Sequence, residues 1–357
     1  MLIALLLIAG LALLLAGAEL LIRGAARLAV ATGLSPLVVG LTVVAFGTSA
    51  PELAIGVDAA LRGVPAIAVG NVVGSNIANV LLVLGLSALV APLVVARRLI
   101  RLDVPLMLAA SLLVMTMALD GRLDRLEGSV LLASAVGYTA FLVRLSRRES
   151  AAALTEARVP GQGVRAVWWC DLGLVLGGLV LLVLGARVLV TAAVDLALGI
   201  GLSELVIGLT VVAVGTSLPE IAVSIMATAR GHGEMAVGNV IGSNLFNLLV
   251  VLGASAAVSA DGMPVSAAAR GFDLPVMTAV AFACLPIFFT GHRIERWEGG
   301  LFLGYYIAYI GYLLLNGAGH HAAPLLGWVM IGFVLPLTAI TLGVVTVRAW
   351  RARAPLY

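Results

Sequence analysis

The chain has 357 residues, of which 62% are hydrophobic and only 11% are charged, and its formal net charge is +3. Soluble globular proteins carry about 25% charged residues, so this composition excludes a soluble enzyme or binding domain and predicts an integral membrane protein. All 21 basic residues are arginine. In a membrane protein their positions along the chain are more informative than their number.

Apolar stretches long enough to cross a bilayer follow one another along the whole chain. About 20 apolar residues span a hydrocarbon core of roughly 30 Å. The first stretch has no basic segment before it and no small-residue cleavage site after it, so it is predicted to be a retained helix and not a signal peptide. We predict eleven membrane-spanning helices, at residues 2–22, 35–61, 65–92, 104–119, 127–145, 168–190, 203–229, 235–258, 273–290, 298–316 and 323–348.

The two halves of the chain repeat each other. Residues 33–88 align without a gap with residues 201–256, and 35 of the 56 positions are identical. Weaker similarity continues to residues 125–128, which match residues 296–299, so each copy contains five predicted helices. Because five is an odd number, the second copy would enter the membrane from the opposite side, as in the inverted repeats of many secondary transporters.

The predicted fold is therefore an all-α integral membrane protein, with a ten-helix core of two inverted five-helix repeats plus one extra C-terminal transmembrane helix. The first repeat is assigned to residues 1–145 and the second to residues 167–316. Residues 146–166 are basic and polar, and are predicted to form a flexible cytoplasmic linker. The extra helix, residues 323–348, has no counterpart in the first half.

The arginines predict the orientation in the membrane, because cytoplasmic loops are enriched in basic residues. With the N-terminus outside, sixteen arginines fall on the cytoplasmic side and five on the outer side. We therefore expect a multi-pass protein of the plasma (inner) membrane with its N-terminus outside and its C-terminus in the cytoplasm.

Each repeat places a glutamate within a predicted membrane span. Glu52 ends the sequence GTSAPE, and Glu220 ends the sequence GTSLPE. A carboxylate at membrane depth is unfavourable by a few kcal/mol or more, so it marks a functional site by default. Residues three and four positions apart share a helix face. Each glutamate is thus expected to lie beside two hydroxyl groups, those of Thr48 and Ser49 or those of Thr216 and Ser217.

Pro51 and Pro219 stand directly before the two glutamates. A proline removes one amide donor and frees the carbonyl oxygen four residues earlier, which belongs to Gly47 or Gly215. We expect the helix to break at each proline and to present backbone oxygens that can bind a cation.

The next predicted helix of each half carries a second motif, GNVVGSNIAN or GNVIGSNLFN. Gly74 and Gly242 in these motifs are small enough to let a neighbouring helix approach closely. Hydrogen bonding between helices is an alternative role for the asparagines. One serine and one asparagine share a face in each helix, namely Ser75 with Asn79 and Ser243 with Asn247.

The motifs offer carboxylate, hydroxyl, amide and backbone oxygens, with no sulfur or imidazole nearby. This ligand set suits a hard cation such as calcium, sodium, magnesium or manganese. Two glutamates supply about two negative charges, which neutralise one divalent ion. Among the other acidic residues, Asp103 and Asp273 each lie two positions before a proline and are predicted to cap the helices that follow.

Together the motifs resemble the alpha-repeats of the sodium/calcium exchanger family, within the calcium/cation antiporter superfamily, and most closely its compact prokaryotic members. The resemblance covers residues 1–316. It implies a central calcium site formed by Glu52, Glu220, Thr48 and Thr216. It also implies flanking sodium sites formed by Ser49, Ser217, Ser75, Ser243, Asn79 and the backbone carbonyls of Ala45 and Ala213.

One departure concerns Asn247, where many family members carry aspartate. The two halves are symmetric here, with asparagine at both positions, and the site has one acid fewer. The potassium-dependent branch typically has an aspartate there as well, so the resemblance implies exchange that does not depend on potassium.

The implied activity is antiport of calcium for sodium by alternating access, with no cofactor, and with the first and sixth helices moving against the ligand-bearing bundle. Calcium/proton exchange is the main alternative, although the GNxxE pattern usual in cation/proton exchangers is absent. A cation channel is a second alternative. An intramembrane enzyme is disfavoured because no zinc, Ser-Lys or Asp-Asp arrangement occurs in the predicted spans. We expect calcium, sodium and lipid as partners, and no nucleic acid or obligate protein partner.

Overall fold

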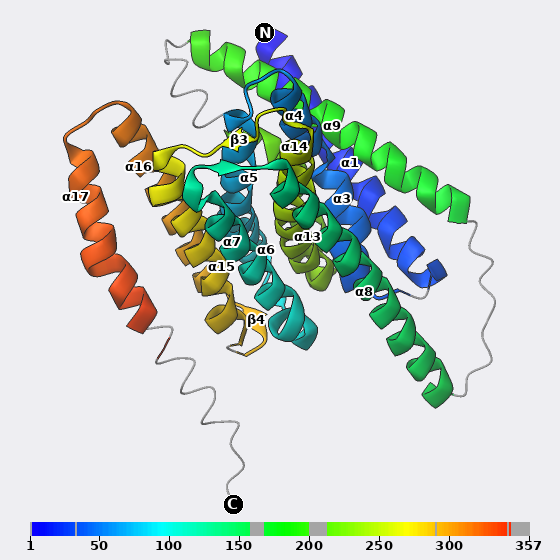
Figure 1. Ribbon diagram of the computed structural model, residues 1–357. Coiled ribbons are helices and arrows are strands. Elements are labelled where there is room, and N and C mark those ends of the chain that lie inside the picture. The colour runs from blue at the N-terminus through cyan, green and yellow to red at the C-terminus, as the bar shows by residue number, and fades with distance from the viewer. Residues whose placement is uncertain are drawn as a thin grey trace, which may run out of the picture.

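The structure, a computed structural model, describes residues 2–32, 34–157, 168–199, 213–289, 291–340 and 343. Helices form nearly all of this part of the chain (Figure 1). Eight of the described helices are long and apolar enough to cross a membrane, or nine if the bent pair Pro36–Thr48 and Ala50–Leu61 counts as one span. The chain is therefore a multi-pass membrane protein. The spans predicted at residues 203–229 and 323–348 extend outside the described residues, so the predicted number of eleven is not tested.

The first half contains the helices α1 (Leu2–Thr32), α2 (Pro36–Val39), α3 (Ala45–Thr48), α4 (Ala50–Leu61), α5 (Ala66–Ala78), α6 (Gly85–Val90), α7 (Val104–Met117) and α8 (Arg125–Ala157). The second half contains α9 (Trp168–Gly199), α11 (Ala213–Thr216), α12 (Leu218–Ala229), α13 (Gly233–Phe246), α14 (Leu252–Val258), α15 (Leu274–Phe289), α16 (Arg296–Gly317) and α17 (Ala322–Val329). A 3₁₀ turn, η4 (Ala118–Asp120), follows α7.

Several spans contain a π-helical turn, in which the backbone hydrogen bonds reach one residue further than in an α-helix. Such turns widen the helix and are frequent at functional sites. The turns η2 and η6 begin at Asn79 and Asn247, the last asparagine of each repeated motif. The π-helical turns are η1 (Gly40–Val44), η2 (Asn79–Leu84), η3 (Leu99–Asp103), η6 (Asn247–Val251), η7 (Ala269–Asp273) and η8 (Met330–Val334).

The two spans that carry the GN motifs lie at the centre of the bundle. They are Ala66–Val90 and Gly233–Val258, and 78% of the most apolar stretch of each is buried, compared with 33% for α1. The outer helices expose leucines such as Leu5 and Leu11, as expected for surfaces that face lipid. Polar groups of the central spans must therefore find partners inside the protein.

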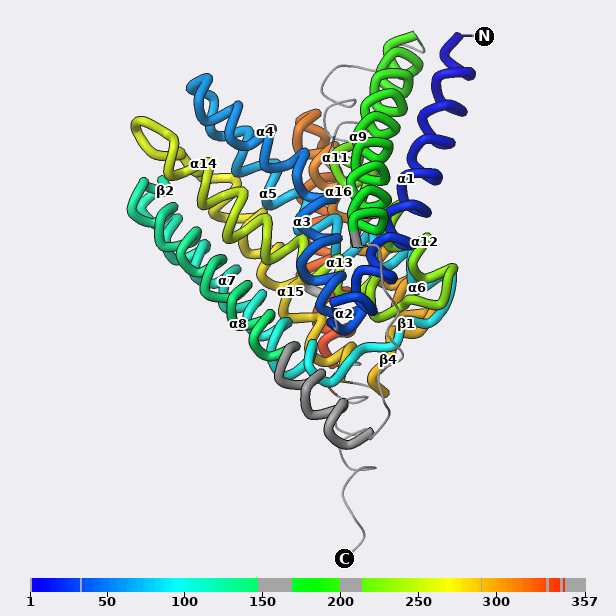
Figure 2. The backbone as a smooth tube through the Cα atoms, turned by 90° about the vertical axis from the view of Figure 1, so that its right-hand side faces the viewer, coloured from blue at the N-terminus to red at the C-terminus, as the bar shows by residue number. Residues whose placement is uncertain are grey.

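Helices α1 and α9 pack against each other along their length, and both views show them side by side (Figures 1 and 2). They run antiparallel, because Gly10 lies against Leu189 whereas Gly24 lies against Val175. A Cβ atom at Gly10 would lie 2.8 Å from the backbone nitrogen of Leu189. Glycine thus permits the close contact of the two backbones, as in other tightly packed membrane helices.

Two short β-ribbons were not predicted. Strand β1 (Leu93–Val94) pairs antiparallel with β4 (Arg293–Ile294), and β2 (Arg122–Leu123) pairs antiparallel with β3 (Met263–Pro264). Each ribbon joins a loop of the first half to a loop of the second half.

The helix α8 continues to Ala157, so it extends through the first part of the predicted linker at residues 146–166. The remainder of that linker lies outside the described residues. At the other end of the chain, α17 stands apart from the bundle beyond α16 (Figure 1). The hydroxyl group of Tyr305 on α16 forms a hydrogen bond with that of Thr338, which follows the π-helical turn η8.

Candidate cation-binding site

Two broken helices bring polar groups to the centre of the protein. Helices α3 and α4 meet at Ser49, where the chain bends by 45°, and α11 and α12 meet at Ser217. Pro51 lies in the first turn of α4, and Pro219 lies in the first turn of α12. Backbone N–H groups in the first turn of a helix have no hydrogen-bond partner within the helix, so proline removes no bond there. Both glutamates follow in that same first turn, at the positive end of the helix dipole, which favours their negative charge.

The glycines that precede the two breaks lie against α9. A Cβ atom at Gly47 would lie 2.4 Å from a methyl carbon of Leu179, and one at Gly215 would lie 2.4 Å from a methyl carbon of Val190. Glycine at these positions therefore lets α9 pack directly over both helix breaks.

Both glutamates are buried, with Glu52 at 0% and Glu220 at 1% exposure. The hydroxyl of Ser49 donates to Oε1 of Glu220 at 3.1 Å. Both carboxylate oxygens of Glu52, and Oε2 of Glu220, have no hydrogen-bond partner among the described residues. Burying a carboxylate without a compensating positive charge is unfavourable by several kcal/mol. A bound cation or a bound proton would offset this cost.

The hydroxyl groups at the breaks are also buried. Thr48 is 1% exposed, and its Oγ1 lies 3.3 Å from Oδ1 of Asn239 and 3.4 Å from the hydroxyl of Ser243, both on α13. The hydroxyls of Ser75 and Ser217 are buried and have no partner among the described residues. Each is an oxygen that can bind a cation.

For three other predicted ligands, the structure shows either an oxygen that already accepts hydrogen bonds or only the position along the helix. The carbonyl oxygen of Ala45 accepts from the amide of Ser49 at 3.0 Å and from the hydroxyl of Thr48 at 3.4 Å, so it would have to release one of them to bind a cation. Thr216 ends α11 and is half-buried. Ala213 begins α11, so its carbonyl lies one turn before Ser217.

Asn79 and Asn247 are 1% and 0% exposed. Each donates one hydrogen bond through its amide nitrogen to an asparagine of the opposite half, at 3.0 Å for Asn79 and 3.1 Å for Asn247. Each carboxamide oxygen has no partner among the described residues. The two roles considered for these asparagines, helix pairing and ion binding, thus involve different atoms of the same side chain.

The motif glycines differ in their surroundings. A Cβ atom at Gly242 would lie 2.6 Å from the carbonyl oxygen of Leu41, so only glycine allows this close contact. No described atom lies within 4 Å of the corresponding position at Gly74. Residues 200–212, which include the repeat equivalent of Leu41, are outside the described part of the chain, so the packing role of Gly74 stays a prediction.

Several buried polar residues near the site were not predicted as part of it. Asn76 accepts the hydrogen bond from the amide nitrogen of Asn247, and Asn244 accepts the one from Asn79. Asn239 donates to the hydroxyl of Ser224 at 3.1 Å. Ser224 lies four positions after Glu220, on the same helix face, and this spacing could have identified it. Within the described ranges, no group of three or more His, Cys, Asp and Glu side chains is placed to hold a metal ion. A cation here would depend on neutral oxygens as well as on the two glutamates.

The prediction that Asp103 caps the following helix is wrong, because its side chain makes no capping hydrogen bond. Tyr138 of α8 instead donates its hydroxyl proton to Oδ1 of Asp103 at 2.9 Å. Tyr309 of α16 donates in the same way to Asp273 at 3.0 Å. These two aspartates therefore link neighbouring helices.

Comparison with known proteins places the chain in a family. The family described as sodium/calcium exchanger protein matches residues 2–144 and 171–315. The putative antiporter CaxA of Alkalimonas amylolytica is 39% identical over 321 residues, which cover 88% of this chain and 99% of the relative. The sodium/calcium exchanger MaX1 of Methanosarcina acetivorans is 31% identical over 342 residues, covering 86% and 97%.

Solved structures lead to the same family. A structure of the sodium-calcium exchanger NCX_Mj matches with a TM-score of 0.74 and 32% identity, covering 87% of this chain and 98% of that chain. The relatives are named as exchangers or antiporters, which are transporters and not enzymes. The resemblance found in the two repeated motifs is confirmed, and the chain belongs to the sodium/calcium exchanger protein family.

Proposed function

We propose that the protein is a secondary antiporter that exchanges calcium for sodium by alternating access. The observation that carries this proposal is the pair Glu52 and Glu220, which are buried and leave three of their four carboxylate oxygens without a partner in the described residues. Their two charges match one calcium ion, and the surrounding oxygens complete a shell of about six to eight ligands. Membership of the sodium/calcium exchanger protein family supports the same activity.

Adjoining sites around the two carboxylates would couple the two ions. Calcium would bind Glu52 and Glu220 with Thr48 and Thr216, and sodium would bind neutral oxygens that adjoin the same carboxylates. Because both are hard cations that prefer oxygen, binding of one would disfavour the other. The proposed sodium ligands are Ser49, Ser217, Ser75, Ser243, Asn79, Asn247 and the carbonyls of Ala45 and Ala213.

We assign no role to potassium, because Asn79 and Asn247 are both neutral and leave the site with only two acids. Calcium/proton exchange is the second candidate. It is favoured by the unpartnered carboxylate of Glu52, which can take up a proton in place of a cation.

The proposed topology consists of two inverted repeats with the N-terminus outside, in the plasma (inner) membrane. The antiparallel packing of α1 against α9 supports it, because these helices begin the two repeats. Each β-ribbon also pairs two loops that the arginine distribution assigns to the same side: cytoplasmic for β1 with β4, and outer for β2 with β3.

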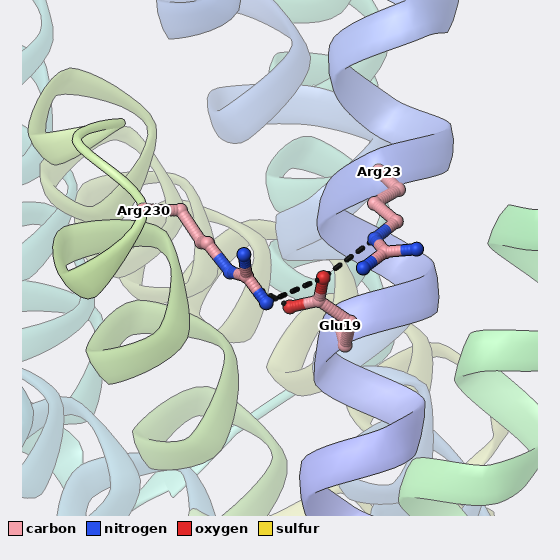
Figure 3. A network of polar contacts seen from close by, with 3 residues as sticks. All are labelled: Glu19, Arg23 and Arg230. Atoms are coloured by element: carbon pink, nitrogen blue, oxygen red, sulfur yellow. Dashed lines mark hydrogen bonds and ion pairs between the residues drawn. The ribbon is translucent and has the colours of Figure 1, made fainter.

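Helices α1 and α9 are the proposed moving elements, and one ion-pair cluster connects α1 to the ligand-bearing bundle. Glu19 of α1 lies 2.8 Å from the guanidinium of Arg230, which directly follows α12, the helix that carries Glu220 (Figure 3). Arg23, one turn further along α1, also donates to Glu19 at 2.5 Å. Movement of α1 relative to α12 would have to break the contact between Glu19 and Arg230.

Calcium tracer flux in proteoliposomes tests this proposal. Purified protein would be reconstituted, and calcium uptake would be measured under an outward sodium gradient, a proton gradient or a potassium gradient, each imposed alone. The proposal predicts uptake with the sodium gradient only, and no change when potassium is added to both sides. Uptake driven by the proton gradient alone would establish calcium/proton exchange instead. Uptake without any gradient, accompanied by single-channel currents in a planar bilayer, would indicate a channel.

A further inference from the structure

Asn76 and Asn244 form a reciprocal contact between the two central helices. Asn76 lies on α5 and Asn244 on α13, and each side chain is 2% exposed. The amide nitrogen of Asn76 donates to the backbone carbonyl of Asn244 at 3.3 Å, and that of Asn244 donates to the backbone carbonyl of Asn76 at 3.3 Å. The contact has the same form in both directions.

These bonds determine which end of each carboxamide is the nitrogen. A backbone carbonyl can only accept, so the group that faces it must be the NH₂ group. The same nitrogens also lie near the sulfur atoms of Met277, at 3.8 Å, and Met107, at 3.5 Å, which are weak acceptors. Reversing either asparagine would place its oxygen against a carbonyl oxygen and a sulfur, with no donor between them. The carboxamide oxygens of Asn76 and Asn244 must therefore face away from these groups.

The orientation of Asn76 and Asn244 determines the orientation of one further asparagine in the opposite half. The oxygen of Asn76 accepts from the amide nitrogen of Asn247 at 3.1 Å, and the oxygen of Asn244 accepts from that of Asn79 at 3.0 Å. Asn247 and Asn79 must therefore direct their nitrogens toward the contact and their oxygens away from it. Those two oxygens are buried and have no partner among the described residues.

The helix face that carries Asn247 borders the broken helix of the other half. Ser243 is four positions before Asn247, on the same face of α13, and its hydroxyl lies 3.4 Å from that of Thr48. An amide that turned its NH₂ group toward a cation would repel it, whereas the oxygen would attract it. The orientation of these amides therefore decides whether they help or hinder cation binding.

We propose that Asn76 and Asn244 are positioning residues that fix the carboxamide oxygens of Asn247 and Asn79 as ligands of the cation site. This role rests on the proposed function, because it needs a cation at that site. Neither positioning residue has to touch the ion. Each acts across the interface, on the ligand of the opposite half.

A double-mutant cycle tests the role of Asn76. Sodium affinity of the purified full-length protein would be measured by equilibrium binding for the parent, Asn76→Leu, Asn247→Asp and the double variant, with thermal unfolding as a check of folding. Leucine is similar in volume but cannot accept a hydrogen bond, so Asn76→Leu should weaken sodium binding by about fivefold to tenfold. An aspartate presents oxygen in either orientation. In the Asn247→Asp background, Asn76→Leu should therefore not weaken the affinity, because it also removes the carboxamide oxygen that would face the new carboxylate.

The mirror cycle, Asn244→Leu with Asn79→Asp, serves if Asn76→Leu does not fold, and it should give the same non-additive pattern. Ser111→Ala, which removes a buried hydroxyl that bonds only within α7, is the matched control and should leave the affinity unchanged. Equal losses from the leucine substitution in the asparagine and aspartate backgrounds would overturn the positioning role while leaving the proposed function intact. A parent protein that binds no sodium would overturn the proposed function and, with it, this role.

Discussion

Ser49 and Glu220 are joined by a hydrogen bond of 3.1 Å between residues 171 positions apart in the sequence. Ser49 lies at the helix break of the first half and Glu220 just after that of the second half. The two halves therefore meet through a side chain of the site itself. No corresponding bond joins Ser217 to Glu52, because the Ser217 hydroxyl and both Glu52 oxygens lack partners in the described part of the chain. Near-identical motifs thus hold their carboxylates differently.

This difference predicts unequal effects for two equivalent substitutions. Ser49→Ala removes a hydrogen bond to a charged group, which should raise the calcium concentration for half-maximal uptake by about tenfold. Ser217→Ala removes no such bond and should have a smaller effect, about threefold or less. Calcium uptake measured over a range of calcium concentrations compares the two variants. Equal effects would show that the two carboxylates are held in the same way during transport.

Neutralising either glutamate should abolish exchange without destabilising the protein. Glu52→Gln and Glu220→Gln each remove one of the two charges that would bind calcium, so sodium-driven calcium uptake should be lost. Because a buried amide is less unfavourable than a buried carboxylate without a partner, the unfolding temperature in calcium-free buffer should be at least as high as that of the parent. Calcium should then raise the unfolding temperature of the parent but not of the variants. Variants that still transport calcium, or that unfold at lower temperature, would contradict this assignment.

The ion pair between Glu19 and Arg230 should affect transport more than stability. Both side chains are partly exposed, at 17% and 53%, so their contact contributes only about 0–1 kcal/mol to the free energy of unfolding. If α1 moves against α12, Arg230→Gln should still change the maximal rate of calcium exchange, because the contact exists in only one arrangement of the two helices. The rate and the unfolding temperature would be measured on the same preparations.

The exchanged triple Glu19→Arg, Arg23→Glu and Arg230→Glu, which reverses every charge of the cluster, should restore the parent rate. Arg62→Gln is the matched control, because it breaks a 2.7 Å ion pair with Asp58 that lies within one segment. An Arg230→Gln rate equal to that of the parent, or a failure of the exchanged triple to restore it, would argue against this contact as part of the transport cycle.

Gly242→Ala should disturb the site through packing. The added Cβ atom would lie 2.6 Å from the carbonyl oxygen of Leu41, so α13 would have to move away from the helix that leads to Thr48. We expect a loss of about 1–3 kcal/mol in stability and weaker calcium binding. Gly137→Ala on α8 is the control, because no described atom lies within 4 Å of the position of its Cβ. Equal unfolding temperatures for the two variants would contradict the packing role of Gly242.

The sequence predicts the described spans, and it predicts that Glu52 and Glu220 are equivalent, because both inferences depend on local features. Apolar length sets where helices cross the bilayer, and the alignment of the two halves identifies Glu52 and Glu220 as a pair. The β-ribbons could not be predicted, since two-residue strands form only where loops distant in sequence meet. The extension of α8 to Ala157 was missed because the apolar stretch ends before the helix does.

The inequality of Ser49 and Ser217 could not be predicted either, because both lie in the same GTS motif. The orientation of Asn79 and Asn247 depends on backbone carbonyls of the opposite half, which no local pattern reveals.

Competition between sodium and calcium for the site around Glu52 and Glu220 is the central claim, and equilibrium binding tests it most directly. Calcium affinity of the purified protein would be measured with increasing sodium chloride, with choline chloride holding the ionic strength constant, for the parent and for Glu52→Gln and Glu220→Gln. The account predicts that sodium weakens calcium binding to the parent progressively, and that neither variant binds calcium measurably. Calcium affinity that is unchanged by sodium, or retained in both variants, would contradict it.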